Sequence, residues 1–206
     1  MKNPLYHQLS DYDCGPTALL DGVSFLFDRD RIPPEVIRNI MLYCLDCYGS
    51  DGVSGKSGTS WAAMMFLSNW LNGFGKVGRL PISSQYISGK NVNLSRQGIV
   101  CDALKRKGAV VIRLFYDEWH YVLLTGEQDN DILMFDPYYR EEPYEQKDIR
   151  IDTEHPFSYN RIVPRQYFDR EELGMYALGP AQDREAVLLF NDEIKLTAEK
   201  TIEYFI

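Results

Sequence analysis

Cysteine is scarce in this chain, which contains four cysteines in 206 residues. Cys14, Cys44, Cys47 and Cys101 are too few and too irregularly spaced for a disulfide framework. The N-terminal sequence also lacks the apolar core of a secretory signal peptide. We therefore expect four thiols, in a soluble protein with a cytoplasmic location.

Long apolar runs are missing as well, since no stretch approaches the roughly 18 apolar residues of a transmembrane helix. Positive charge is not in excess: 22 Lys and Arg against 30 Asp and Glu give a formal net charge of -8. Neither a membrane span nor a nucleic-acid partner is therefore expected. The length suits a real hydrophobic core, and we expect a single domain over residues 1–206.

Helical spacing is typical of the first half of the chain. Apolar residues recur three and four positions apart after Cys14, with Asp13 placed as an N-cap, so Cys14 is expected at a helix N-terminus. Further helices are expected at residues 34–44, 60–72 and 99–104, the last of them closed by Gly108.

From Ala109 onward the pattern changes to strands. Runs rich in β-branched and aromatic residues lie at 109–116, 119–126, 131–137 and 185–191, with a polar hairpin turn between the second and third. Helices followed by an antiparallel sheet are the α+β pattern. We therefore predict an α+β fold in which N-terminal helices pack on an antiparallel sheet.

Two segments rich in Gly, Ser and Asn are expected to lack regular structure: a flexible loop at 49–60 and an irregular stretch at 73–94. Gly-Lys-Ser at 55–57 lacks the glycine that a phosphate-binding loop requires at position 50. Cys44 and Cys47 form a CxxC pair, but no further pair completes a zinc site. We expect no metal and no cofactor, with two thiols or an adventitious disulfide at this pair.

A thiol at a helix N-terminus faces unpaired amide groups and the positive end of the helix dipole, which favour the thiolate. Cys14 is therefore a candidate nucleophile, and it needs an imidazole as its proton carrier. Of the three histidines, His120 is the best placed, because a strand holds a ring more rigidly than a loop does. Asp136, at the end of the next strand, is a candidate to orient that ring.

Gln8, just upstream of Cys14, is a candidate donor to an oxyanion, alongside the Cys14 backbone amide. The alternatives for these residues are plain ones: a buried thiol, a core histidine, an aspartate that starts a turn before Pro137, and a surface glutamine.

Four stretches of the chain resemble a known family: His7–Leu20 ("HQLSDYDCGPTALL"), Lys56–Leu67 ("KSGTSWAAMMFL"), Trp119–Gly126 ("WHYVLLTG") and Met134–Tyr139 ("MFDPYY"). The family is that of the bacteriocin-processing cysteine peptidases, papain-like domains that trim double-glycine leaders, and their stand-alone relatives. The resemblance covers roughly residues 5–140. It implies a papain-like fold with Cys14 as nucleophile, His120 as base, Asp136 as its orienting partner and Gln8 in the oxyanion hole.

The predicted activity is hydrolysis of peptide or isopeptide bonds, with a peptide or protein as substrate. Trp119 and Tyr121 flank His120 and, with Tyr138 and Tyr139, are expected to shape the substrate groove, although strand alternation prevents all of them from facing it. Two alternatives stay open: an acyl transferase or deamidase on the same scaffold, and a non-catalytic peptide-binding module. The sequence leaves the oligomeric state open.

Overall fold

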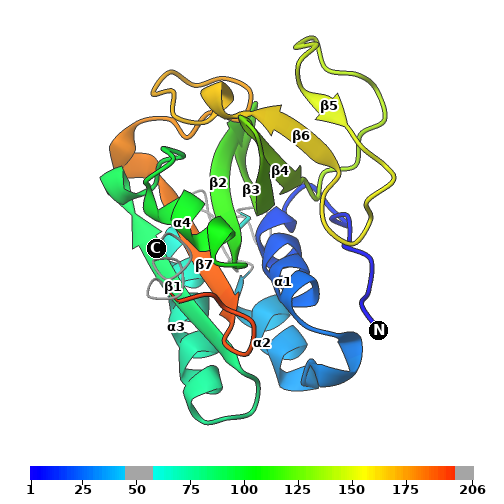
Figure 1. Ribbon diagram of the computed structural model, residues 1–206, viewed down its shortest axis with the longest axis vertical. Helices are drawn as coiled ribbons and strands as arrows, with labels where there is room; N and C mark the ends of the chain where they lie inside the picture. The colour runs from blue at the N-terminus through cyan, green and yellow to red at the C-terminus, as the bar shows by residue number, and fades with distance from the viewer. Residues whose placement is uncertain (45–57, 198–206) are drawn as a thin grey trace, which may run out of the picture.

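The fold is known from a computed structural model, which describes residues 1–44 and 58–197. Within these residues, seven strands form one antiparallel sheet in the order β1-β7-β2-β3-β4-β6-β5 (Figure 1). The strands are β1 (Ile82–Ser88), β2 (Ala109–Tyr116), β3 (Glu118–Gln128), β4 (Asp131–Phe135), β5 (Arg150–Ile151), β6 (Arg161–Pro164) and β7 (Glu185–Asn191).

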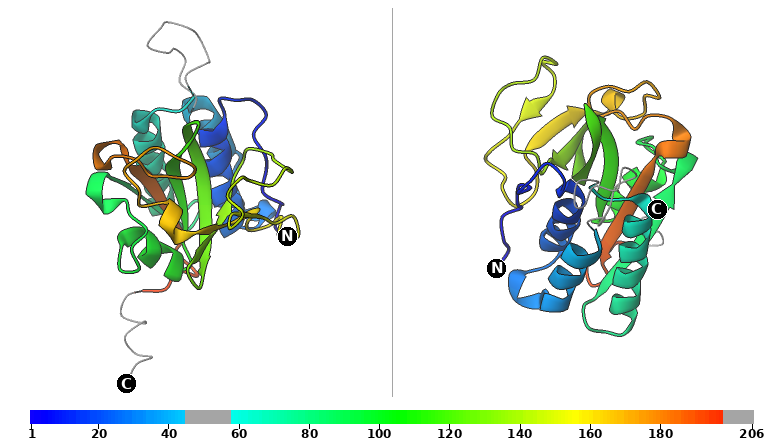
Figure 2. Two further views of the ribbon diagram at one scale, coloured as in Figure 1. Left: turned by 90° about the horizontal axis from the view of Figure 1, so that it is seen from above. Right: turned by 180° about the vertical axis from the view of Figure 1, so that it is seen from behind.

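Helices cover both faces of this sheet. Three of them pack on one face: α1 (Cys14–Leu26), α2 (Pro34–Cys44) and α3 (Trp61–Lys76). The shorter α4 (Ile99–Lys105) packs on the other face (Figure 2). The predicted α+β class, with N-terminal helices packed on an antiparallel sheet, is confirmed.

Strand β2 has a continuous apolar sequence because both of its faces are buried. Ala109 and Val111 pack into the core beneath α1, α2 and α3, whereas Val110, Ile112 and Leu114 pack into the core on the α4 side. A strand that is buried on both faces has no polar face to alternate with. The central strands therefore form a rigid platform between the two cores.

The expectation of irregular structure at 73–94 is wrong. Helix α3 continues through Gly73 to Lys76, and β1 follows as an edge strand paired with β7 along its whole length. Strand β1 contains three serines and a glutamine, so its sequence lacks the apolar alternation that usually reveals a strand. Pairing with the buried strand β7 determines its conformation instead.

Gly108 does not close α4 in the expected way. Lys107 takes the left-handed conformation there, with φ 62°, and the Gly108 amide donates to the Ala103 carbonyl at 2.9 Å. A Cβ at Gly108 would lie 2.7 Å from the Phe190 ring. Gly108 is thus needed for a close approach rather than for its backbone angle.

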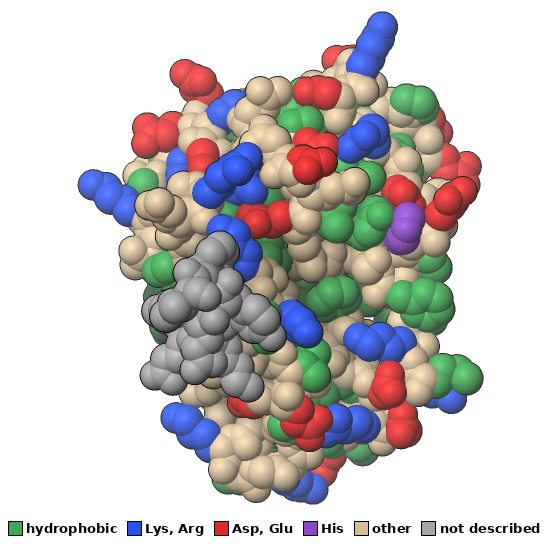
Figure 3. Space-filling model, viewed as in Figure 1, with side chains coloured by type: hydrophobic (Ala, Val, Ile, Leu, Met, Phe, Trp, Pro, Cys, Tyr) green, Lys and Arg blue, Asp and Glu red, His purple; other side chains and the backbone are tan. Residues whose placement is uncertain are grey.

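Several sequence-based expectations concern residues that lie outside the described ranges, namely Cys47 and most of the loop at 49–60. In the part of the chain that is described, no helix is long and apolar enough to cross a membrane. Nor does this part contain a group of three or more His, Cys, Asp or Glu side chains that could hold a metal ion. On the face shown in Figure 3, Lys and Arg side chains are scattered among Asp and Glu.

Candidate active site

Cys14 is the first residue of α1, and its side chain is buried. The amides of Cys14 and Gly15 have no partner within the helix, and Pro16 has no amide hydrogen, whereas the Thr17 amide donates to the Asp13 carbonyl at 3.1 Å. Asp13 occupies the N-cap position but does not cap the helix with its side chain. Its carboxylate instead accepts from the Leu9 amide at 2.9 Å and from the Ser10 amide at 2.6 Å, which folds the preceding turn against the helix start.

Gly15 is required by a close contact with the start of α3. A Cβ at Gly15 would lie 2.2 Å from Thr59 Oγ1 and 2.7 Å from Thr59 Cβ. The Ser60 hydroxyl caps α3 by accepting from the Ala63 amide at 3.2 Å. The Cys-Gly pair therefore lets the ends of two helices meet next to the thiol.

The sheet brings His120 and Asp136 together. β3 pairs with β4 so that Leu123 lies opposite Phe135, and Asp136 follows directly at the end of β4. His120 Nε2 and Asp136 Oδ1 lie 2.7 Å apart. This contact uses Nε2 of the ring, which leaves Nδ1 for the sulfur of Cys14, and both side chains line the same cavity.

This pair is charged across the neutral pH range. Burial alone would lower the pKa of His120, but the charge of Asp136 and the hydrogen bonds to Asp136 and Cys14 raise the pKa to about 10. Burial alone would raise the pKa of Asp136, but the charge of His120 and its hydrogen bond, followed by the charge of Arg161, hold it below its usual value. An imidazolium ion therefore faces the thiol.

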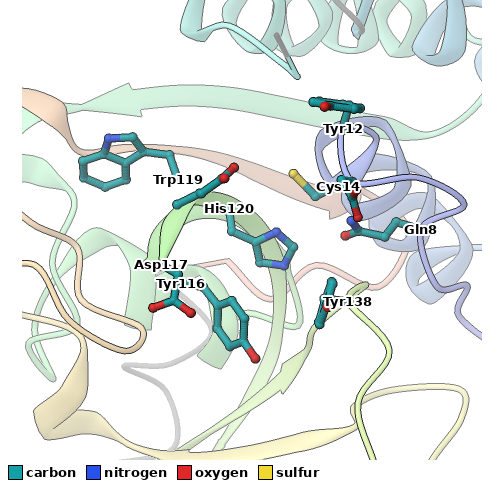
Figure 4. A pocket seen from close by; sticks show the side chains of 10 residues that line it. Gln8, Tyr12, Cys14, Tyr116, Asp117, Trp119, His120 and Tyr138 are labelled. Carbon is teal, nitrogen blue, oxygen red and sulfur yellow. The ribbon is translucent and has the colours of Figure 1, made fainter. Parts of the chain in front are cut away.

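Gln8 lies beside this group. Its backbone amide donates to the Pro137 carbonyl at 2.9 Å, which ties the N-terminal segment to the residue after Asp136. Its side-chain Nε2 donates one hydrogen to the Ser10 carbonyl at 2.7 Å. An amide nitrogen carries two hydrogens, so the second is left for a ligand. Figure 4 shows Gln8, Cys14 and His120 converging on one cavity.

That cavity has a volume of about 330 Å³ and is lined by both aromatic and acidic side chains. The aromatic ones are Tyr12, Tyr116, Trp119 and Tyr138, and the acidic ones are Asp11, Asp117 and Glu118. Asp117 makes the tight turn between β2 and β3 with φ 57°, a conformation that is uncommon outside glycine. The turn aims its neighbours, Tyr116 and Glu118, at the cavity.

The residues predicted to shape the groove are placed differently from one another. Trp119 and Tyr138 line the cavity with Cys14, and Trp119 is held by the Arg113 guanidinium, 4.7 Å from its ring centre. Tyr121 is buried and lines an adjoining cavity that also reaches Cys14, while its hydroxyl donates to Glu185 at 2.7 Å. Tyr139 instead borders a separate cavity with His7 and Phe135.

The sequence did not reveal the surroundings of Asp136. Asn160 Nδ2 donates to the Asp136 carbonyl, and the Asp136 amide donates to Asn160 Oδ1, both at 2.8 Å. The Tyr138 amide donates to Asp136 Oδ1 and the Tyr176 hydroxyl to Oδ2, also at 2.8 Å. Asn160 and Tyr176 lie beyond the stretch that resembles a known family, and the only available signal was a polar Asn-Arg pair at the start of a short strand.

Solved structures similar to this chain are peptidase domains. A C39-like peptidase from Bacillus anthracis is 15% identical, covers 90% of this chain and 93% of its own, and has a TM-score of 0.48. A double glycine motif protease from an AMS/PCAT transporter, in complex with the leader peptide, is 14% identical, with coverages of 91% and 89% and a TM-score of 0.45. The peptidase domain of Streptococcus mutans ComA is 13% identical, with coverages of 91% and 98% and a TM-score of 0.40.

The motifs of this chain resemble peptidases of this kind, and the similar structures are described as such peptidases. No protein-family model matches the chain, and no curated protein matches it either. The function is inferred below from the residues of this chain.

Proposed function

We propose that this protein is a papain-like cysteine peptidase in which Cys14, His120 and Asp136 form the catalytic unit. The observation that carries the proposal is the buried His120–Asp136 pair, whose imidazole lines one cavity with a thiol at a helix N-terminus. Gln8 and the Cys14 backbone amide are the proposed oxyanion donors. The proposal treats residues 1–206 as one domain.

The reaction follows from this arrangement. The Cys14 thiolate attacks the peptide carbonyl carbon, a C–S bond forms, and the carbonyl electrons move to oxygen. His120, as imidazolium, gives its proton to the leaving nitrogen when the C–N bond breaks. Water then attacks the thioester, the neutral imidazole takes a proton from it, and the thiolate leaves. The products are an amine and a carboxylic acid.

The cavity favours a positively charged peptide. None of Asp11, Asp117 and Glu118 forms an ion pair with another side chain in the described part of the chain, so their charges remain for a substrate. Aromatic walls bind the aliphatic portion of Lys or Arg side chains as well as their charge. Peptides with a basic side chain near the scissile bond, and peptides with the double-glycine motif that the resemblance suggests, belong in the first substrate library.

The test is cleavage of this library in ¹⁸O-labelled water, followed by mass spectrometry. We expect the wild type to yield products with ¹⁸O in the new carboxyl group and Cys14→Ala to yield none. Cys101→Ser alters a buried thiol outside the cavity and should keep wild-type turnover. Cleavage by Cys14→Ala at the wild-type rate would end the proposal. Transfer of the acyl group to an amine, with no ¹⁸O in the product, would favour a transferase. Binding of peptides with no product at all would favour a peptide-binding module.

A further inference from the structure

A chain of buried polar side chains leads from β6 to the carboxylate of Asp136. Arg161 Nε donates to the Tyr144 hydroxyl at 2.8 Å, the two hydroxyl oxygens of Tyr144 and Tyr176 lie 2.6 Å apart, and the Tyr176 hydroxyl donates to Asp136 Oδ2 at 2.8 Å. All four side chains are buried, with exposures of 6% or less. We call Arg161, Tyr144 and Tyr176 the relay.

The hydrogen bonds of the relay have a defined direction. A guanidinium only donates and a carboxylate only accepts. Tyr176 has one hydroxyl hydrogen, which it uses on Asp136, so Tyr144 must donate to Tyr176 and accept from Arg161. Every bond therefore points toward the carboxylate, an arrangement in which each donor strengthens the next.

The relay also joins two buried charges that do not touch. Among the described residues, the Arg161 guanidinium donates to the Tyr144 hydroxyl and to the carbonyls of Asn160 and Tyr138, none of which is a carboxylate. A buried cation and a buried anion are each costly unless they are paired and hydrogen-bonded. Here two tyrosine hydroxyls connect them.

The backbone of Tyr176 carries a second, independent indication. Tyr176 has φ 58°, a conformation that bulky residues rarely adopt, and its side chain is fully buried. Its amide donates to the Phe115 carbonyl and the Phe115 amide to the Ala177 carbonyl, both at 2.8 Å, so the end of β2 holds it in place. Such conformations persist where the surroundings impose them, and they concentrate at functional sites.

We propose that the relay positions Asp136 and stabilises its charge, so that it tunes the basicity of His120 without contacting the substrate. This inference rests on the proposed function and gives residues beyond 140 a role in it. The three relay members are positioning residues. The titratable and charged groups around Asp136 are His120 on β3, Arg161 on β6, Tyr144 and Tyr176 from the loops, and His7 from the N-terminal segment.

Loss of the Tyr176 hydroxyl should raise the pKa of His120 and not lower it. A donor on Asp136 stabilises the carboxylate most when His120 is neutral, because an imidazolium already compensates part of the charge. Loss of the Tyr176 hydroxyl therefore makes the carboxylate a stronger partner for the imidazolium and raises the pKa of His120. We expect a rise of about half to one pH unit, with a kcat a few-fold lower because the imidazolium becomes a weaker acid.

The experiment is an NMR titration of the His120 ring in Tyr176→Phe, Tyr144→Phe and Tyr86→Phe, together with the alkaline limb of kcat/KM. Tyr86→Phe is the matched control, since it removes a hydroxyl that donates to the buried carboxylate of Glu185 at 2.9 Å, away from Asp136. We expect a raised His120 pKa in Tyr176→Phe, a smaller rise in Tyr144→Phe and none in Tyr86→Phe. Burial lowers the pKa of His7, so His7 stays neutral over the alkaline range.

An unchanged or lowered His120 pKa in Tyr176→Phe would overturn the proposal. If that variant does not fold, Tyr144→Phe decides by the same criterion. The titration requires no substrate, so it separates the two claims. A raised pKa in a protein that never cleaves a peptide would uphold the relay and end the peptidase proposal, whereas cleavage with an unmoved pKa would do the reverse.

Discussion

Asp136→Asn is the substitution that isolates the charge of Asp136 from its shape. Asparagine retains an oxygen that accepts from His120 Nε2 and from the Tyr138 amide, which now bond Oδ1 at 2.7 and 2.8 Å. The ring therefore keeps its orientation and loses only its counter-charge. Burial, which lowers the pKa of a histidine, is then opposed only by Cys14.

The expected loss of activity in Asp136→Asn follows from the pKa of His120. Burial lowers it, but the charge of Asp136 and the hydrogen bonds to Asp136 and Cys14 raise it from 6.5 to about 10. Without that charge we expect a pKa of about 7 or lower. At about pH 9 the imidazolium would then be roughly a hundredfold less populated, so kcat/KM should fall by about that factor. The loss at about pH 6 should be much smaller.

The charge of Asp136 should also contribute to stability. Folding raises the pKa of His120, so its contribution to stability is complete below about 6.5 and disappears as the pH rises through about 10. We therefore expect Asp136→Asn to cost about 3 kcal/mol near pH 7 and much less above pH 10. Urea unfolding of the wild type and of Asp136→Asn across this pH range measures the free energy of unfolding of each.

The control for this prediction is Asp152→Asn. Asp152 and His155 form another His–Asp pair with a 2.8 Å contact, but on the surface. Its loss should cost less than about 1 kcal/mol and leave activity unchanged. If kcat/KM of Asp136→Asn falls at the same alkaline pH as that of the wild type, the charge of Asp136 does not hold His120 protonated, and the reasoning is refuted.

Three further predictions concern neighbouring residues. Gly15→Ala should lower the free energy of unfolding by about 1–3 kcal/mol through its clash with Thr59, whereas Gly73→Ala, where a Cβ meets nothing within 4 Å, should be neutral or stabilising in urea unfolding. Iodoacetamide near neutral pH should alkylate Cys14 well before Cys101, because burial raises the Cys101 pKa to about 11; peptide mapping that finds equal rates would contradict this. Gln8→Ala should lower kcat by roughly a hundredfold with little change in KM, and steady-state kinetics showing only a raised KM would count against an oxyanion role.

The sequence predicts the elements whose pattern is strong and local. The start of α1 at Cys14 and the strands at 109–116 and 185–191 lie as expected, because their apolar spacing is clear. Edge strand β1 was not predicted, because its sequence is polar and its conformation depends on pairing with β7. A conformation imposed by a distant neighbour leaves no local signal.

The same distinction applies to the candidate site. Gln8, Cys14, His120 and Asp136 stand in short motifs that could be recognised, and the structure brings them together. The relay could not be predicted, because it combines residues from three separate stretches whose contacts exist only after folding. The left-handed backbone of Tyr176 has no signature in its sequence, since no glycine or asparagine marks the position.

The most direct test of the peptidase proposal is the covalent adduct between Cys14 and a substrate carbonyl. A pool of peptide aldehydes, ¹³C-labelled at the aldehyde carbon, would be mixed with the wild type and with Cys14→Ala, and NMR would detect the tetrahedral carbon bonded to sulfur. The account predicts this resonance in the wild type and its loss in the variant. Absence of the resonance in the wild type, or its persistence in Cys14→Ala, would contradict the claim that Cys14 is the nucleophile.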